Sequence, residues 1–243
     1  MPARPSAAGL VAALLLAVVA LAAAPEARAA GTAFAVDTSE ISETGSCKVE
    51  AWTSRADNRD SLATVNPACV VEIIRPVELS AQLARSRADE EWTTTIAPKA
   101  KTKLVPTQIG SFGLALAAGS SFDLTEGEQA TIFAYAPATL RLSEIVRINV
   151  NGGWLWDRTV DQHYLTYGIG LDWKVTDILT LTVETFGQAG HAEDAAVTQP
   201  RFQSGLRLRP IDTLSFDLIY GRNLNGEDAN WMTLAMTVRF PAK

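Results

Sequence analysis

The two histidines of this 243-residue sequence are the first candidates for acid–base chemistry. His163 follows Asp161 by two positions, and a carboxylate beside an imidazole can orient it as a general base. A nucleophile would have to come from elsewhere, because the sequence contains no G-x-S-x-G motif. His191 lies in a polar stretch that lacks the spacing of a metal site. We therefore expect no enzyme, no cofactor and no bound metal; an enzyme using His163 or His191 is the third of three functional hypotheses.

The two cysteines have a spacing that suits a single β-hairpin. If the chain pairs with itself about Asn58, position i faces position 116 minus i, so Cys47 faces Cys69 and Val49 faces Pro67. Directly opposed residues of a non-hydrogen-bonded pair come close enough for a disulfide. We predict a Cys47–Cys69 disulfide, which stabilises the hairpin by about 3 kcal/mol in the chain-entropy model. The alternative is a pair of buried thiols.

Charged side chains recur at every second position within apolar stretches. If the apolar positions form one face, the charges lie on the other, which in a membrane barrel is the lumen. Both signs occur on neighbouring stretches, so the charges can pair in a salt-bridged polar filling. The other interpretation is a charged constriction that filters solutes, with a slight preference for anions. The predicted lumen network consists of Lys48, Glu50, Glu72, Glu78, Lys99, Lys101, Lys103, Arg147, Asp172, Glu184, Arg207, Arg209, Asp217 and Arg239.

These charges need strands to position them, and the chain from Ser46 onward alternates between apolar and polar residues with a period of two. Turn residues separate the alternating stretches, and short connections alternate with longer polar ones. These features predict an all-β fold, a transmembrane antiparallel β-barrel of about 12 strands. A soluble β-sandwich or lipocalin-like barrel also alternates and is the alternative. The predicted strands are 46–54, 62–74, 77–86, 91–104, 110–119, 129–137, 144–154, 163–173, 178–188, 200–209, 213–222 and 230–240.

The start of the chain and its overall charge bear on location and partners. The 27 acidic and 21 basic side chains give a net charge of -6, which argues against a nucleic-acid binder. A basic start, an Ala-rich apolar run and an A-x-A pattern are typical of a secretory signal peptide, with a membrane anchor helix as the alternative. We predict a cleaved signal peptide over 1–29, an acidic periplasmic lead-in over 30–45, the barrel over 46–240 and a tail over 241–243. The lead-in could instead enter the lumen as a short plug.

The last strand resembles the C-terminal sorting signal of outer-membrane proteins. Every second residue back from Phe240 is apolar, and this aromatic residue closes the alternation, although three residues follow it. The resemblance implies a barrel in the outer membrane of a Gram-negative bacterium. Its implied partners are outer-membrane lipid and the barrel-assembly machinery, which would bind through the C-terminal strand.

Three turn phrases carry a wider resemblance. They read KVTDILTL at 174–181, RPIDTLSF at 209–216 and YGRNLNG at 220–226. Together they resemble the transporter barrels named after the meta-cleavage pathway of phenol degradation. The resemblance implies an outer-membrane barrel that passes small solutes, aromatic compounds among them. Our leading hypothesis is therefore a passive transporter or channel for small solutes. The second is a non-transporting structural or binding barrel that acts through acidic extracellular loops.

Overall fold

Twelve β-strands make up the regular structure of the part of the chain that the structure describes. The structure is a computed structural model and describes residues 33–88, 90–190, 200–224 and 229–242. In chain order the strands are β1 (Cys47–Ala56), β2 (Ser61–Glu72), β3 (Pro76–Ala88), β4 (Glu91–Val105), β5 (Phe112–Asp123), β6 (Glu128–Arg141), β7 (Val146–Asp157), β8 (Gln162–Lys174), β9 (Leu179–Gly190), β10 (Arg201–Ile211), β11 (Leu214–Asn223) and β12 (Asn230–Phe240). Among the described residues, no helix is long and apolar enough to cross a membrane.

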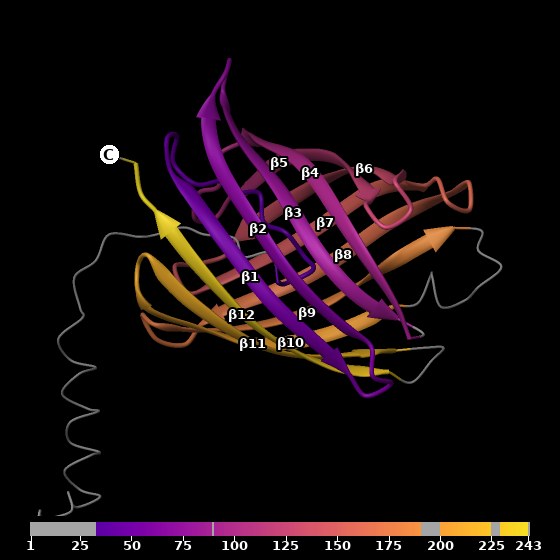
Figure 1. Ribbon diagram of the computed structural model, residues 1–243. Coiled ribbons are helices and arrows are strands. Elements are labelled where there is room, and N and C mark those ends of the chain that lie inside the picture. Colours follow the sequence, from indigo (N-terminus) through magenta and orange to yellow (C-terminus); the bar gives the residue numbers. More distant parts are fainter. Residues whose placement is uncertain (1–32, 89, 191–199, 225–228, 243) are drawn as a thin grey trace, which may run out of the picture.

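The strands pair in sequence order and close into a barrel (Figure 1). The first and last strands complete the ring, with Cys47 opposite Phe240 and Ala56 opposite Trp231. Closure leaves no strand edge open, so backbone polar groups are satisfied without water. The predicted all-β, 12-stranded antiparallel barrel is confirmed.

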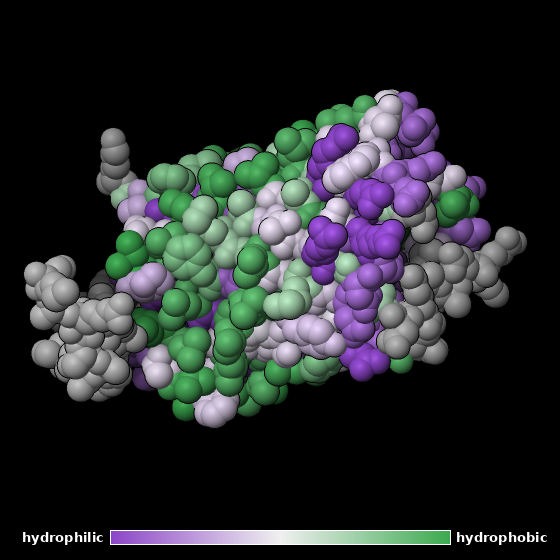
Figure 2. All heavy atoms as spheres, turned by 60° about the horizontal axis from the view of Figure 1, so that its bottom comes forward, coloured by the Kyte–Doolittle hydropathy of each residue, from purple (hydrophilic) through white to green (hydrophobic). Residues whose placement is uncertain are grey.

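The two ends of the barrel differ. We call the end at which β2 turns into β3 and β10 into β11 the turn end; the C-terminus lies there too. At the opposite end, which we call the loop end, β1 turns into β2 and β7 into β8, and the longest interval between consecutive strands separates β9 from β10. Figure 2 shows apolar side chains over the turn end and the middle of the barrel, and polar side chains gathered toward the loop end.

Side chains alternate along each strand between the outside and the lumen. On β8, outward Leu165, Ile169 and Trp173 are 65%, 50% and 47% exposed, whereas Tyr164 and Asp172 on the other parity are buried. A strand that is apolar outside and polar inside suits a barrel whose outer surface meets lipid. The alternation therefore places the charged side chains in the lumen.

Residues 33–45, which we call the lumen segment, run inside the barrel before β1 begins (Figure 1). Phe34, Val36 and Ser39 are 7%, 3% and 0% exposed. Gly45 leads into β1 with a φ of 84°, a conformation that glycine adopts without strain. The structure thus buries residue 34 and residues 36–40 of the predicted lead-in inside the barrel. The physical reason is that the barrel wall supplies partners for its polar groups. The predicted signal peptide over 1–29 lies outside the described residues.

Candidate functional site

Ion pairs within and between strands line the lumen. Arg207 on β10 faces Asp217 on β11, with Nε 2.6 Å from Oδ1 and Nη2 3.0 Å from Oδ2. Lys48 Nζ on β1 lies 3.7 Å from Glu50 and 3.4 Å from Glu78 on β3. All five residues are buried. A buried charge is tolerated only when it is paired. These ion pairs therefore hold the charged side chains in defined positions.

A further polar cluster surrounds Asp172 on β8. One carboxylate oxygen accepts hydrogen bonds from Arg147 Nε at 2.6 Å and from Asn149 Nδ2 at 2.8 Å. The other oxygen accepts one from the Thr182 hydroxyl at 2.6 Å. These donors come from β7 and β9, the two neighbours of β8, so the carboxylate links three adjacent strands.

Asp37 joins the lumen segment to the barrel wall through ion pairs. Its Oδ1 accepts a hydrogen bond from Lys101 Nζ at 2.8 Å, and its Oδ2 accepts one from the Tyr135 hydroxyl at 2.9 Å. Lys99 Nζ lies 3.9 Å from Oδ2 and donates to the Tyr135 oxygen at 3.2 Å. A carboxylate of the lumen segment, which is not one of the barrel strands, therefore pairs with two lysines of the wall.

Polar side chains of the wall also bind the backbone of the lumen segment. The amides of Ala35 and Val36 donate to the two carboxylate oxygens of Glu184 at 2.9 and 3.3 Å. The Ser39 amide donates to the Thr139 hydroxyl oxygen at 2.9 Å. These side chains satisfy amide groups that would otherwise need a strand or water as partner.

Glycines on two strands make room for the segment. A Cβ at Gly168 on β8 would lie 2.9 Å from Val36 Cγ2, and one at Gly205 on β10 would lie 2.9 Å from the Phe34 ring. The Arg207 guanidinium lies 5.2 Å from the centroid of the Phe34 ring, within range of a cation–π interaction. A larger side chain at either glycine would occupy space that the segment fills.

The lumen segment reaches from one wall of the barrel to the opposite one. Phe34 contacts β10 and Asp37 binds β4, strands that lie six places apart in the ring of twelve. Glu40 then lies 3.4 Å from Arg147 on β7. The three steps from Phe34 to Asp37 cover roughly 10 Å of extended chain. The lumen is therefore narrow at this depth, and the segment crosses it.

The residues of the predicted lumen network fall into three groups by their exposure to solvent. Its buried members are Lys48, Glu50, Glu78, Lys101, Asp172, Glu184, Arg207 and Asp217. Its half-buried members are Lys99, Lys103, Arg147, Arg209 and Arg239. Glu72 is exposed and accepts a hydrogen bond from the Thr44 hydroxyl at 3.2 Å. The contacts bring most of these residues together along the lumen, whereas a role in solute selection stays a prediction.

Sequence reasoning missed the carboxylates of the lumen segment and the hydroxyl of Tyr135. No periodicity marks residues 33–45, and Asp37 meets Lys101 across 64 positions of sequence. One signal was available, because the predicted network holds eight bases and six acids while the segment itself is acidic. Charge complementarity between the two would have favoured a position inside the lumen.

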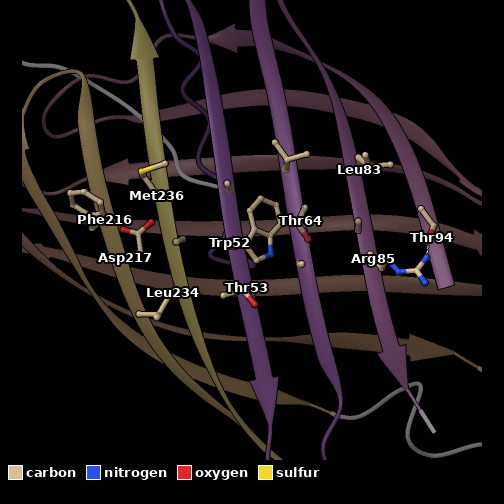
Figure 3. Close-up of a pocket in the computed structure, with 15 residues that line it drawn as sticks. Trp52, Thr53, Thr64, Leu83, Arg85, Thr94, Phe216, Asp217, Leu234 and Met236 are labelled. Carbon is tan, nitrogen blue, oxygen red and sulfur yellow. Dashed lines mark hydrogen bonds between the residues drawn. The ribbon is translucent and has the colours of Figure 1, made fainter. Parts of the chain in front are cut away.

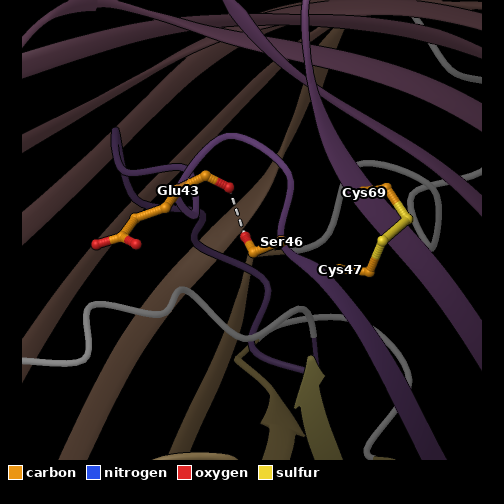
Figure 4. The surroundings of a disulfide bond; sticks show 4 residues. All are labelled: Glu43, Ser46, Cys47 and Cys69. Carbon is orange, nitrogen blue, oxygen red and sulfur yellow. Dashed lines mark hydrogen bonds between the residues drawn. A yellow bond between two sulfur atoms is a disulfide. The ribbon is translucent and has the colours of Figure 1, made fainter. Parts of the chain in front are cut away.

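The Cys47–Cys69 disulfide joins β1 and β2 as predicted (Figure 4). The register matches the predicted pairing, with Cys47 opposite Cys69 and Val49 opposite Pro67, and the cysteine Cα atoms are 4.0 Å apart. Ser46, the residue before the bridge, donates its hydroxyl hydrogen to a carbonyl oxygen of the lumen segment at 2.5 Å. The bridge therefore lies where the lumen segment enters the barrel wall.

His163 lies among tryptophans on the outward parity of β8. Its ring centroid is 5.6 Å from those of Trp154 and Trp156. Asp161, the expected orienting carboxylate, accepts a hydrogen bond from the Trp156 indole nitrogen at 3.0 Å. Among the described residues no hydrogen bond joins Asp161 and His163, so the structure does not show the Asp–His pair of the third hypothesis. His191 lies outside the described residues. Within the described ranges, no group of three or more His, Cys, Asp or Glu residues is placed to hold a metal ion.

An apolar groove of about 760 Å³ runs along the outside of the barrel over β11, β12 and β1 to β4 (Figure 3). Leu83, Phe216, Leu234 and Met236 line it and are 42%, 42%, 59% and 41% exposed. These four residues have outward parity. The groove therefore lies on the apolar outer surface, and buried Thr64 and Asp217 of the lumen parity also border it.

The fold is similar to those of three solved outer-membrane channels and porins. The COG4313 outer membrane channel from Pseudomonas putida F1 matches with a TM-score of 0.61 and 14% identity, over 83% of this chain and 97% of that one. The KdgM porin in complex with disordered oligogalacturonate matches with a TM-score of 0.60 and 9% identity, over 79% and 99% of the two chains. The NanC porin matches with a TM-score of 0.60 and 5% identity, over 78% and 98%. Identities this low show a shared fold.

Comparison of the sequence with family models identifies a family, whereas comparison with individual curated proteins finds no match. The matching family model does not carry the phenol-degradation name that the turn phrases suggested. Residues 17–240 match the model, and the chain thus belongs to the family described as Uncharacterised conserved protein UCP029691.

Proposed function

We propose that this protein is a passive outer-membrane channel for small solutes, and that its lumen segment acts as a plug. The observation that carries the proposal is a closed barrel with a polar, ion-paired lumen, crossed by a segment that is not one of its strands. The similarity in fold to proteins described as porins and channels supports this function.

The chemistry of the lumen suits water-soluble cargo. Its wall presents charged and hydroxyl groups, such as those of Arg207, Asp172 and Thr139, and these groups can exchange partners with a hydrated solute. One porin of similar fold is described in complex with oligogalacturonate, which supports passage of a small polar solute here. The direction of selectivity depends on which wall charges the plug leaves free.

Location and assembly complete the proposal. The apolar outer surface fits outer-membrane lipid, with the turn end in the periplasm and the loop end outside the cell. Residues 1–29 would direct export and be cleaved. The barrel-assembly machinery would recognise β12, which ends in outward-facing Phe240, 52% exposed.

Liposome swelling tests the channel directly. The barrel would be reconstituted in two forms, the mature chain and a variant that lacks residues 30–45 and begins at Ser46. We expect glucose to enter liposomes containing the shortened variant faster than those containing the mature chain, because removal of the segment clears the lumen. If neither form admits glucose or any smaller solute, the channel function is wrong and a non-transporting barrel acting through its acidic loops is favoured.

A reversible disulfide between the lumen segment and the barrel wall gives the matched control. The hydroxyl oxygens of Ser39 and Thr107 are 2.9 Å apart, so Ser39→Cys with Thr107→Cys places two thiols at a contact between segment and wall. Oxidation should slow solute entry below that of the reduced form. The Ser39→Cys single variant, treated with the same reductant, controls for reduction of the native disulfide.

A further inference from the structure

We infer that Lys99, Lys101 and Tyr135 form a binding site for the carboxylate of a small acidic solute, and that Asp37 occupies it as an internal stand-in. The inference rests on the proposed channel function, because a solute must enter the lumen to reach these residues. It goes further by naming the chemical class of the ligand and the residues that recognise it.

The geometry around Asp37 is that of a built carboxylate site. Each oxygen of the carboxylate has its own donor, the Lys101 ammonium at 2.8 Å and the Tyr135 hydroxyl at 2.9 Å. Lys99 adds a second ammonium 3.9 Å away and also holds the Tyr135 hydroxyl. Charge-assisted hydrogen bonds of this kind are stronger than those between neutral groups. All three donors belong to barrel strands, so they stay in place when the segment moves.

Without Asp37, the same wall would carry an excess of positive charge. Lys99 and Lys101 lie two positions apart on β4 and therefore face the same side of the sheet. Lys101 is 2% exposed, and Glu78, the residue opposite it on β3, also lies 3.4 Å from Lys48. Without Asp37, three lysines (Lys48, Lys99 and Lys101) would share Glu50 and Glu78. A buried excess of positive charge is costly, so the vacated site would favour an anion.

The attachment of the segment allows exchange. Its described contacts with the wall are hydrogen bonds, ion pairs and packing, such as those of Val36, Asp37 and Ser39, and water can replace each of them. A solute carboxylate competes directly for the donors of Asp37, whereas a neutral solute of the same size does not. Binding of an acidic solute should therefore move the segment off the wall.

Accessibility of position 39 reports this movement without any transport. Ser39 is fully buried against the wall, so a cysteine placed there by Ser39→Cys would react with a maleimide only when the segment leaves. The native cysteines are joined in a disulfide, and the described residues contain no free cysteine. Glucuronate and glucose are suitable probes because they share a ring and differ in the carboxylate. A coupled exchange of this kind should raise the labelling rate about fivefold or more with glucuronate, and glucose should leave it unchanged.

Variants of the site test the assignment of residues. Lys99→Gln and Tyr135→Phe, each combined with Ser39→Cys, should reduce the glucuronate response, since each removes one donor. Asp37→Asn should raise labelling even without solute, because the segment loses its ion pairs with Lys99 and Lys101. Lys103→Gln is the matched control: Lys103 lies on the same strand and parity but is not among the donors to Asp37. Its response should equal that of the unmodified site.

Three results would overturn the inference. They are equal labelling with glucose and glucuronate, an undiminished response in Lys99→Gln, and equal acceleration by potassium chloride at the same ionic strength. The last result would mean that salt screening alone releases the segment. Loss of swelling activity with an intact labelling response would instead refute the channel and leave the carboxylate site standing.

Discussion

Arg207 and Asp217 lie opposite one another on β10 and β11 and form two hydrogen bonds, of 2.6 and 3.0 Å, inside the lumen. Their side chains are 7% and 1% exposed. Such a pair is more sensitive to loss of one partner than to loss of both, because the remaining charge stays buried. The pair therefore makes a direct test of whether the lumen charges hold the barrel together.

Replacing the carboxylate by an amide should destabilise the barrel. We expect Asp217→Asn to lower the free energy of unfolding by about 3–5 kcal/mol, the usual cost of breaking a buried ion pair. Urea unfolding of the protein in lipid vesicles, followed by tryptophan fluorescence, measures the change. Asp177→Asn is the control, because it removes a surface pair with Lys174 and should leave stability unchanged. Equal stability of both variants would contradict the structural role of the lumen pair.

Removal of the disulfide should weaken the first hairpin. The bridge closes a loop over a sequence separation of 22 residues, and the chain-entropy model gives about 3 kcal/mol for a loop of this size. The double variant Cys47→Ser with Cys69→Ser should show this loss in the same urea experiment. Reduced wild-type protein should behave like the variant. A non-reduced digest that yields separate Cys47 and Cys69 peptides would refute the bridge itself.

A larger side chain at Gly168 should displace the lumen segment. Gly168→Val keeps a residue that favours strands but places methyl groups where Val36 now packs. We expect faster maleimide labelling of a cysteine at position 39. The mobility of the protein in unboiled gels would show that the barrel is still folded. Gly152→Val is the control, since a Cβ there would meet nothing within 4 Å. If the two valine variants label at the same rate, Val36 does not hold the segment.

The connection from β1 to β2 contains a carboxylate whose titration depends on β12. Asp57 accepts hydrogen bonds from the Asn230 side chain at 2.8 Å and backbone amide at 3.1 Å, and these bonds lower the pKa of Asp57. A lowered pKa means that the contact stabilises the fold above the pKa of the unfolded chain and is lost as pH falls through the folded value. Asn230→Ala should therefore raise the pKa of Asp57, as followed by NMR titration of its carboxyl carbon. An unchanged titration curve would show that the side-chain bond does not form.

The barrel was largely predictable from the sequence because apolar and polar side chains alternate between the two faces of each strand. Period-two alternation fixes which residues share a face, and the turn at Asn58 fixes the register, so the partner of Cys47 followed from both. The strand ends were less certain. The structure extends β1 to Ala56 and β6 to Arg141, past the predicted ends, because pairing continues where the alternation fades.

The lumen segment could not be predicted in the same way. A strand repeats its pattern, but the segment binds through single contacts, such as those from Asp37 to β4 and from Val36 to Glu184 on β9. The second of these joins residues 148 positions apart. Only the closed barrel brings such positions together, so the site depends on tertiary structure that local sequence does not encode.

The place of the disulfide gives the first hairpin a mechanical role. Residues 33–45 continue directly into β1, the strand whose pairing with β12 closes the ring. Any tension on the segment as it leaves the lumen would pull on the first residues of β1 and tend to separate β1 from β12. The disulfide between Cys47 and Cys69 would pass this force to β2, which pairs with β1 on one side and with β3 on the other. In the release that we propose, the barrel wall would therefore stay closed.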